Sequence, residues 1–216
     1  MAHAILFNPP LENNYLGHQI KEIYFDRVYT PYFEGKKDLT IIDVGANVGM
    51  TSYYFSQFAK NVYSLEPSLE HFDILTQMIT HNKLDNVHPI NKALYMKSGK
   101  FPLFHNNNKT MYSLHQAVAD PNLPPEEVEA ITFQQLFADF SIEHVDFLKT
   151  DVEGSEVELF CSTPFKEVAP KIDIVMTEVH QWNGRNSQQL IDGFKDAGFN
   201  NVQQVKSDAS ILVATK

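Results

Sequence analysis

Two glycines after a short apolar segment, with an acidic residue 21 positions beyond the first of them, constrain this chain more than any other feature. The apolar segment ends in Asp43-Val44, and the glycines are Gly45 and Gly49. The acid is Glu66, at the end of a second short apolar segment. This order is typical of a βαβ unit that holds an adenosine-containing ligand. Glycines let the backbone approach the ligand, and the acid accepts hydrogen bonds from ribose hydroxyls.

The spacing of the glycines separates two classes of cofactor. A dinucleotide site has the pattern G-x-G-x-x-G, whose middle glycine is missing here. One residue lies between Asp43 and Gly45, and three lie between Gly45 and Gly49. An acid before this wider loop suits S-adenosylmethionine, because the methionine ammonium needs a carboxylate or carbonyls nearby. The sequence therefore predicts S-adenosylmethionine as the cofactor, and a nicotinamide-dependent oxidoreductase is the disfavoured alternative.

Length and charge exclude several classes of protein. The 216 residues fit one α/β domain, and 17 basic against 27 acidic residues give a net charge of −10. The longest basic run is Lys36-Lys37, so neither nucleic acid nor an anionic membrane is expected as a partner. Cys161 is the only cysteine, which rules out an internal disulfide. Because no signal-peptide pattern is visible, we expect a cytoplasmic protein.

Hydrophobic periodicity predicts an N-terminal helical extension, residues 1–37, on an α/β domain of residues 38–216. The helix is expected within residues 11–30 and to end at Pro31. Strands and helices then alternate, which predicts a parallel sheet with right-handed crossovers. The expected strands are 40–44, 62–66, 87–91, 145–150 and 172–179, with helices at 47–60, 133–140, 155–161, 187–197 and a further helix that Ser68 caps.

Residues 93–125 interrupt this alternation. Residues 93–104 are predicted to form two short strands paired around the turn Lys97–Lys100, and residues 129–132 an edge strand. The rest of the insertion is either a surface loop or a lid over the substrate. Together with the N-terminal helix, it could also form the contact of a homodimer. The chain is predicted to end in an antiparallel hairpin of residues 199–205 and 210–214.

Four segments together resemble the FkbM family of S-adenosylmethionine-dependent methyltransferases. They are Ile41–Gly49, the strand ending in Glu66-Pro67, Val145–Glu156 with its Asp-Val-Glu-Gly sequence, and Thr177–His180. The resemblance implies a Rossmann-like class I methyltransferase fold, with a seven-stranded, mostly parallel sheet that ends in the antiparallel hairpin. It also implies O-methylation of a hydroxyl on a sugar, glycan or small natural product.

The first half of the chain supplies the predicted cofactor site. Asp43 is expected to anchor the amino-acid end of the cofactor, or instead to organise the loop. Glu66 is expected to take the ribose hydroxyls. Asn47 either holds the loop or contacts the methionine carboxylate, and Asn91 either lies near the adenine or has a structural role. The complete set of predicted cofactor-binding residues is Asp43, Gly45, Asn47, Gly49, Glu66 and Asn91.

The predicted catalytic residues follow two neighbouring strands. Asp151 and Glu153 come after one, and Glu178 and His180 after the next. Alternation places the members of each pair on one side of an extended chain. Four ionisable groups at one sheet edge are costly unless they bind or react with something. Alternatively, Asp151 and Glu153 cap the following helix, since acids stabilise helix N-termini.

Three mechanisms fit these catalytic candidates, Asp151, Glu178 and His180. His180 is the natural general base for a hydroxyl proton, because its ordinary pKa lies near 6.5. Asp151 could serve instead, or orient His180. A Mg²⁺ ion on Asp151, Glu153 and Glu178 could acidify the hydroxyl. Trp182, in the loop after His180, could stack on a sugar ring or serve only for packing.

Two broader alternatives remain for the whole chain. One is a non-catalytic cofactor-binding or regulatory protein, which the intact Asp151 and His180 disfavour. The other is methyl transfer to protein or RNA. The acidic net charge disfavours RNA, and the Asn/Asp-Pro-Pro-aromatic motif that amino-group methylators use is missing after the strand at 145–150.

Overall fold

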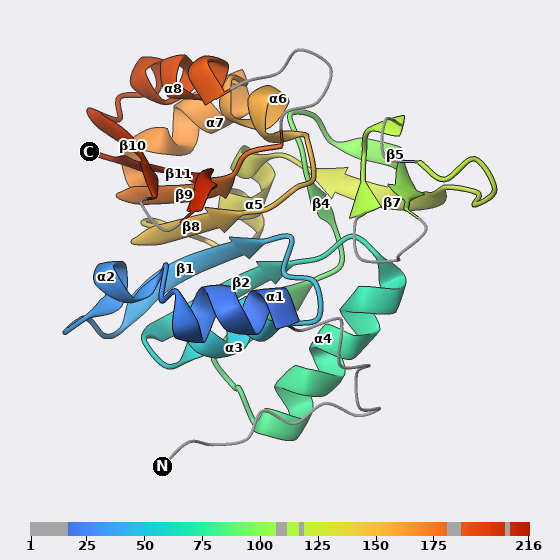
Figure 1. Cartoon of the computed structure of the whole chain (residues 1–216), viewed down its shortest axis with the longest axis horizontal. Coiled ribbons are helices and arrows are strands. Elements are labelled where there is room, and N and C mark those ends of the chain that lie inside the picture. Colours follow the sequence, from blue (N-terminus) through green and yellow to red (C-terminus); the bar gives the residue numbers. More distant parts are fainter. Residues whose placement is uncertain (1–16, 107–111, 117–118, 181–186, 206–207) are drawn as a thin grey trace.

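A seven-stranded sheet organises the computed structural model, which describes residues 17–106, 112–116, 119–180, 187–205 and 208–216 (Figure 1). The strand order is β10-β11-β9-β8-β1-β2-β3. β3, β2, β1, β8 and β9 run parallel, whereas β11 is antiparallel to both of its neighbours. The strands are Leu39–Val44 (β1), Ala59–Leu65 (β2), Val87–Ile90 (β3), Phe147–Thr150 (β8), Ile174–Glu178 (β9), Asn201–Val205 (β10) and Asp208–Thr215 (β11). The predicted sheet and its C-terminal hairpin are confirmed.

Helices cover both faces of this sheet, so its central strands are apolar on both sides. On one face, aromatic rings from the helices pack together, as between Phe160 and Phe165 at 4.8 Å and between Phe160 and Phe194 at 4.7 Å. The helices on this face are Phe133–Asp139 (α5), Glu156–Phe160 (α6), Thr163–Val168 (α7), the short η3 (Ala169–Lys171) and Ser187–Asp196 (α8). The other face carries Met50–Ser56 (α3), Leu69–Asn82 (α4) and the N-terminal elements.

The N-terminal segment packs on the α3 face as several short elements. They are Gly17–Ile20 (α1), Lys21–Phe25 (η1) and Thr30–Phe33 (α2). Phe33 is fully buried against Phe147 of β8, with ring centroids 4.9 Å apart. Pro31 does not end a helix as predicted but lies in the first turn of α2, where its fixed φ suits a helix start. Residues 1–16 of the predicted extension lie outside the described residues.

A second sheet of four strands is the main feature that the sequence did not predict. Its order is β4-β7-β5-β6, with bounds Ala93–Leu94 (β4), Gly99–His105 (β5), Tyr112–Ser113 (β6) and Glu126–Ile131 (β7). The predicted pairing of the two strands around Lys97–Lys100 is wrong, because β7 lies between β4 and β5. β7 is therefore not an edge strand either. Figure 1 shows this sheet beyond the carboxyl end of β1.

Local boundaries differ from the prediction where the chain turns. The helix predicted at 47–60 is shorter, since Ala59 and Lys60 already belong to β2. Ser68 precedes α4 as predicted, but its side chain makes no capping hydrogen bond.

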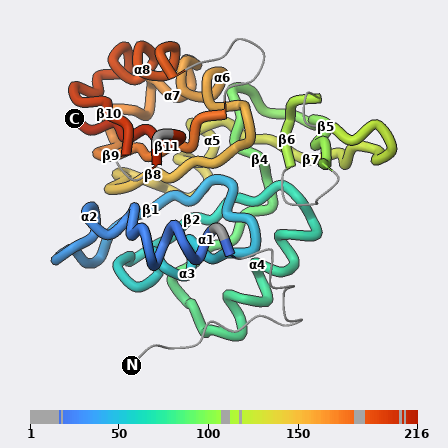
Figure 2. Tube along the Cα trace, viewed as in Figure 1, coloured from blue at the N-terminus to red at the C-terminus, as the bar shows by residue number. Residues whose placement is uncertain are grey.

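In the tube view, α4 and α8 lie at opposite ends of the molecule (Figure 2). Within the described residues, no helix combines the length and the hydrophobicity that a membrane span requires.

Candidate active site

A pocket of about 590 Å³ opens between the carboxyl ends of the main strands and the second sheet. The main sheet contributes the ends of β1, β2 and β8, and the second sheet contributes a largely apolar wall. The lining residues are Val44, Gly45, Asn47, Leu65, Glu66, Pro67, His71, Lys92, Ala93, Leu94, Leu103, Tyr112, Leu114, Asp151, Val152, Glu153 and Ser155.

The loop after β1 depends on its two glycines. Gly45 has a φ of +71°, and a Cβ there would lie 1.9 Å from the carbonyl oxygen of Asp151. Gly49 has a φ of +97°, and a Cβ would lie 2.2 Å from the methyl carbon of Met78. Both positions therefore favour glycine for their conformation, and Gly45 also needs it for space, because its obstacle is backbone. Gly45 lines the pocket, whereas Gly49 packs against α4.

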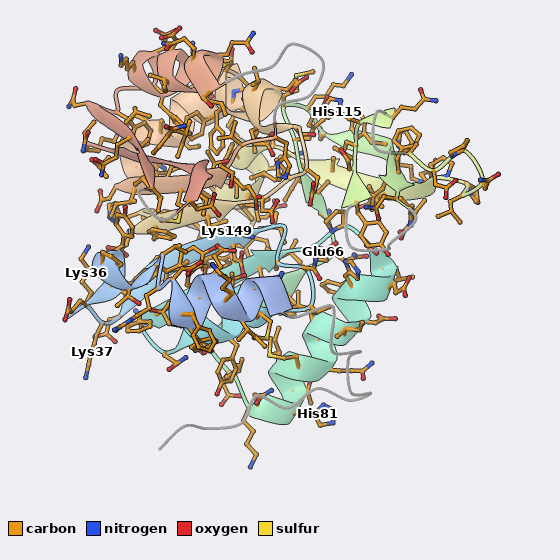
Figure 3. All side chains as sticks on the ribbon, in the orientation of Figure 1. Lys36, Lys37, Glu66, His81, His115 and Lys149 are labelled. Atoms are coloured by element: carbon orange, nitrogen blue, oxygen red, sulfur yellow. The ribbon has the colours of Figure 1, made fainter. Side chains whose placement is uncertain are left out.

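Glu66 is a buried acid on the pocket wall (Figure 3). Its Oε2 accepts a hydrogen bond from the backbone N–H of Asn47, and its Oε1 accepts one from that of Ser68, each at 2.9 Å. Burial raises the pKa of Glu66 to about 7, although the two N–H donors oppose this rise. Glu66 thus changes its charge near neutral pH. Asn47 also lines the pocket and has a φ of +51°.

Two of the predicted cofactor residues, Asp43 and Asn91, lie outside the pocket lining. Asp43 is fully buried, and its Oδ2 accepts hydrogen bonds from the hydroxyls of Thr51 and Ser52, each at 2.7 Å. Asn91 donates to the carbonyl oxygen of Glu66 at 2.9 Å. Neither residue lines the pocket. Their observed contacts organise the loops around it, and their roles toward a cofactor stay predictions.

Lys149, a residue of β8 labelled in Figure 3, contacts both the loop after β1 and the loop after β8. Its Nζ donates to the carbonyl oxygen of Gly45 at 3.0 Å and lies 3.6 Å from Asp43 Oδ1 and 3.9 Å from Asp151 Oδ2. The side chain is 9% exposed. Although burial lowers the pKa of Lys149, the charges of Asp43 and Asp151 raise it overall, so the ammonium stays charged. The residues Lys36 and Lys37 lie at the far end of the molecule from Glu66 (Figure 3).

Carboxylates surround His180 beside the pocket. Its Nδ1 pairs with Glu156 Oε1 at 2.8 Å, and its Nε2 lies 3.2 Å from Glu153 Oε2. Asp151 Oδ1 and Glu178 Oε1 each lie 4.0 Å from the same Nε2. The structure therefore brings together all four predicted residues of the reaction centre and adds Glu156. Asp151 and Glu153 line the pocket, whereas Glu178 and His180 do not.

The cluster shifts the proton affinities of its members. Burial alone lowers the pKa of His180, but the hydrogen bond to Glu156 and the surrounding negative charges raise it to about 10. Burial, reinforced by the charge of Asp151, raises the pKa of both Glu153 and Glu178. His180 is thus an imidazolium at neutral pH, held between carboxyl groups. A role as general base would first require it to lose this proton.

One grouping in the cluster could hold a metal ion. Ligand atoms of Asp151, Glu178 and His180 lie within 4.8 Å of one another. The sequence predicted Glu153 in place of His180. An imidazole in the set suits Mg²⁺ poorly, because this ion prefers oxygen ligands, and a protonated histidine cannot ligate. The donor set therefore does not fit the predicted magnesium ion.

Sequence reasoning missed several residues of this site. No role was assigned to Lys149 or Glu156 from the sequence. The wall from the second sheet, with Leu103 and Tyr112, depends on strand pairings that have no local signal. The position of Lys149 one residue before Thr150-Asp151, inside an apolar strand, was the available clue, since a buried lysine needs partners. Trp182 lies outside the described residues.

Comparison with known proteins defines the class. The structure resembles a methyltransferase FkbM from Methylobacillus flagellatus (TM-score 0.55, 12% identity), covering 83% of this chain and 44% of that one. It also resembles a methyltransferase from Streptococcus mutans in complex with SAH (TM-score 0.54, 11% identity; 88% and 97% covered). A SAM-dependent methyltransferase from Aquifex aeolicus gives a TM-score of 0.50 at 15% identity (91% and 90% covered). These likenesses establish the class I methyltransferase fold.

The family follows from the sequence match. The Methyltransferase FkbM domain matches residues 43–200, most of the chain. The chain therefore belongs to the FkbM family of methyltransferases, and this membership supports S-adenosylmethionine-dependent methyl transfer as its activity. The chain spans less than half the length of the Methylobacillus protein. A comparison with curated proteins gives no significant match.

Proposed function

We propose that this protein transfers the methyl group of S-adenosylmethionine to a hydroxyl oxygen of a sugar, glycan or small natural product. The observation that carries the proposal is that Glu66, Asp151 and Glu153 line the same pocket. Glu66 suits the ribose hydroxyls, and the carboxylates of Asp151 and Glu153 suit the positive charges of the cofactor. Asp151 Oδ1 is buried, has no hydrogen-bond partner among the described residues and lies 4.0 Å from His180 Nε2, so a ligand could pair with it, whereas Glu153 Oε2 already faces His180 Nε2 at 3.2 Å.

The chemistry assigns roles within the cluster. The sulfonium carbon is already electrophilic, so the protein mainly has to align the acceptor and accept its proton. Both nitrogens of His180 face carboxylates, at 2.8 and 3.2 Å. Asp151 Oδ1 is buried at the pocket wall. We therefore favour Asp151 as the group that accepts the hydroxyl proton, with His180 as its positively charged neighbour and Glu178 beside it.

A pH-dependent binding experiment tests the cofactor assignment. Calorimetry with S-adenosylhomocysteine should show saturable binding, and NAD should not bind. Because burial raises the pKa of Glu66 to about 7 and ribose hydroxyls donate to its ionised form, affinity should fall below pH 7, by up to about tenfold per pH unit. Glu66→Gln should bind weakly and without this pH dependence. Binding of NAD alone would overturn the proposal, and an unchanged affinity of Glu66→Gln would remove Glu66 from the ribose site.

The same pKa shift acts on stability with the opposite sign. The folded state holds the proton of Glu66 more tightly than the unfolded state, whose pKa is the ordinary 4.5. The contribution of Glu66 to stability is therefore complete below about pH 4.5 and is lost as pH rises toward 7. Over that pH range the unfolded state has lost the proton while the folded state still holds it, so folding becomes less favourable as the pH rises. The ligand binds the ionised form of Glu66, which the folded protein reaches only above about pH 7. Ligand binding should consequently stabilise the protein more at pH 8 than at pH 6.

Substitutions in the cluster separate the two candidate bases. Asp151→Asn should lower turnover by about 100-fold or more, since a general base contributes at least that much. His180→Ala should leave S-adenosylhomocysteine affinity within about threefold, because His180 does not line the pocket. The assay follows radiolabelled methyl transfer from S-adenosylmethionine to a panel of sugars and phenols. If Asp151→Asn keeps turnover while His180→Ala loses it, His180 is the base.

Other predictions accompany this function. Residues 1–37 are proposed as an extension of a catalytic domain spanning 38–216, in a cytoplasmic protein that needs no nucleic acid or membrane. Residues 93–125 are proposed as part of the substrate-facing wall, and a homodimer stays a prediction. Because the donor set does not suit Mg²⁺, we expect turnover to be independent of magnesium. Turnover with and without EDTA decides it.

A further inference from the structure

Ser155 is a fully buried side chain at the start of α6. It is 1% exposed, and its Oγ has no hydrogen-bond partner among the described residues. Serine at the start of a helix ordinarily caps a backbone N–H. Ser155 precedes α6, yet its side chain makes no capping hydrogen bond. A buried hydroxyl without a hydrogen bond costs stability, and a bound ligand would offset that cost.

Ser155 is one of the residues that line the pocket. Ser155 lines it together with Val152 and Glu153, which precede it on the same loop. Ser113 of β6 donates to the carbonyl oxygen of Glu153 at 2.6 Å and thereby ties this loop to the second sheet. Ser155 therefore lies on the part of the lining where the loop after β8 meets the second sheet.

The surroundings indicate what kind of ligand group comes there. The second sheet and its continuation line the pocket with Leu94, Leu103 and Leu114, and Val152 adds a further apolar side chain. Glu66 supplies a carboxylate on another part of the same wall. A nucleoside has matching parts, because its base has apolar faces with a polar edge, and its ribose has hydroxyl donors. A serine hydroxyl can donate to ring nitrogens or accept from an amino group.

We propose that the Ser155 hydroxyl forms a hydrogen bond to the adenine edge of the cofactor and so helps to select an adenine nucleoside. The inference rests on the proposed function, since it assumes that the pocket takes S-adenosylmethionine. Ser155 is a binding residue in this assignment and has no part in proton transfer. Its cost to the fold is offset only when the nucleoside is bound.

Calorimetry and thermal unfolding of Ser155→Ala test this assignment. The probes are S-adenosylhomocysteine and methylthioadenosine, which shares the nucleoside but lacks the amino acid. Both should bind about fivefold to tenfold more weakly, as expected for one lost hydrogen bond. The melting temperature without ligand should not fall, because the removed hydroxyl was unpaired. Ser155→Cys, of similar volume and with a weaker donor, should lie between wild type and Ser155→Ala.

Thr150→Val is the matched control. Thr150 is fully buried with an unpaired hydroxyl as well, but it does not line the pocket. Its replacement should leave both affinities and the melting temperature unchanged or slightly raise the latter.

Other results would overturn the assignment. Unchanged affinities of Ser155→Ala would show that the hydroxyl is not a ligand contact. Weaker binding of S-adenosylhomocysteine alone would place the contact at the amino acid. A melting temperature lowered by several degrees, or a failure to fold, would make the role structural. If the wild-type protein binds neither probe, the proposed function itself fails, which is distinguishable from all three.

Discussion

Gly45→Ala is expected to destabilise the protein by more than about 3 kcal/mol and to weaken S-adenosylhomocysteine binding by about tenfold or more. A Cβ at this position would lie 1.9 Å from the carbonyl oxygen of Asp151, and the φ of +71° is itself unfavourable for alanine. The obstacle is backbone, which cannot rotate away as a side-chain end could. The loop after β1 and the loop after β8 would have to separate at the pocket. Urea denaturation and calorimetry measure the two effects.

Gly198→Ala is the control for the conformational part of this cost. Gly198 also has a positive φ, of +90°, but a Cβ there would meet nothing within 4 Å. Its substitution should cost only about 1 kcal/mol and leave ligand affinity unchanged. Equal effects of the two substitutions would mean that the close approach of Gly45 to Asp151 does not matter.

The parts of the fold that the sequence predicted correctly are those with local signals. β1 and β2 are short apolar segments separated by a helix, and their parallel pairing follows from the right-handed crossover rule. The second sheet lacks such a signal, because β4 pairs in parallel with β7 across the intervening β5 and β6. A glycine-containing turn at Lys97–Lys100 favoured a local hairpin, but β4 and β5 each pair with β7 instead.

The site shows the same division. Gly45 and Glu66 could be recognised because a cofactor loop demands particular residue types at fixed spacing, and both line the pocket. Asp43 was predicted either to anchor the cofactor or to organise the loop. Its hydrogen bonds from hydroxyls of α3 depend on how the helix packs, and its role toward a cofactor stays a prediction. The unpaired state of Ser155 is a property of three-dimensional packing. Sequence patterns show which groups are present but not which of them lack partners.

Lys149→Met is expected to cost about 3 to 5 kcal/mol of stability, because it removes one partner of a buried charge network. Methionine keeps most of the side-chain volume, so the loss reports the charge. Without the ammonium, Asp43 Oδ1 loses its cation at 3.6 Å, and the carbonyl oxygen of Gly45 loses its donor at 3.0 Å. A total stability of about 5 to 15 kcal/mol is typical for a protein, so this variant should be near its threshold. Chemical denaturation measures the loss.

Two further variants show whether the charge network is responsible. Lys166 pairs with Asp196 at 3.5 Å on the surface, so Lys166→Met should change stability by less than about 1 kcal/mol. Asp43→Asn in the Lys149→Met background removes the unpaired carboxylate and should recover part of the loss, since the penalty comes from an uncompensated buried charge. If the double variant is as unstable as the sum of the single ones, Lys149 and Asp43 act independently. The predicted recovery of stability would instead show that Lys149 and Asp43 act as a pair. This pair then holds the loop after β1 against β8.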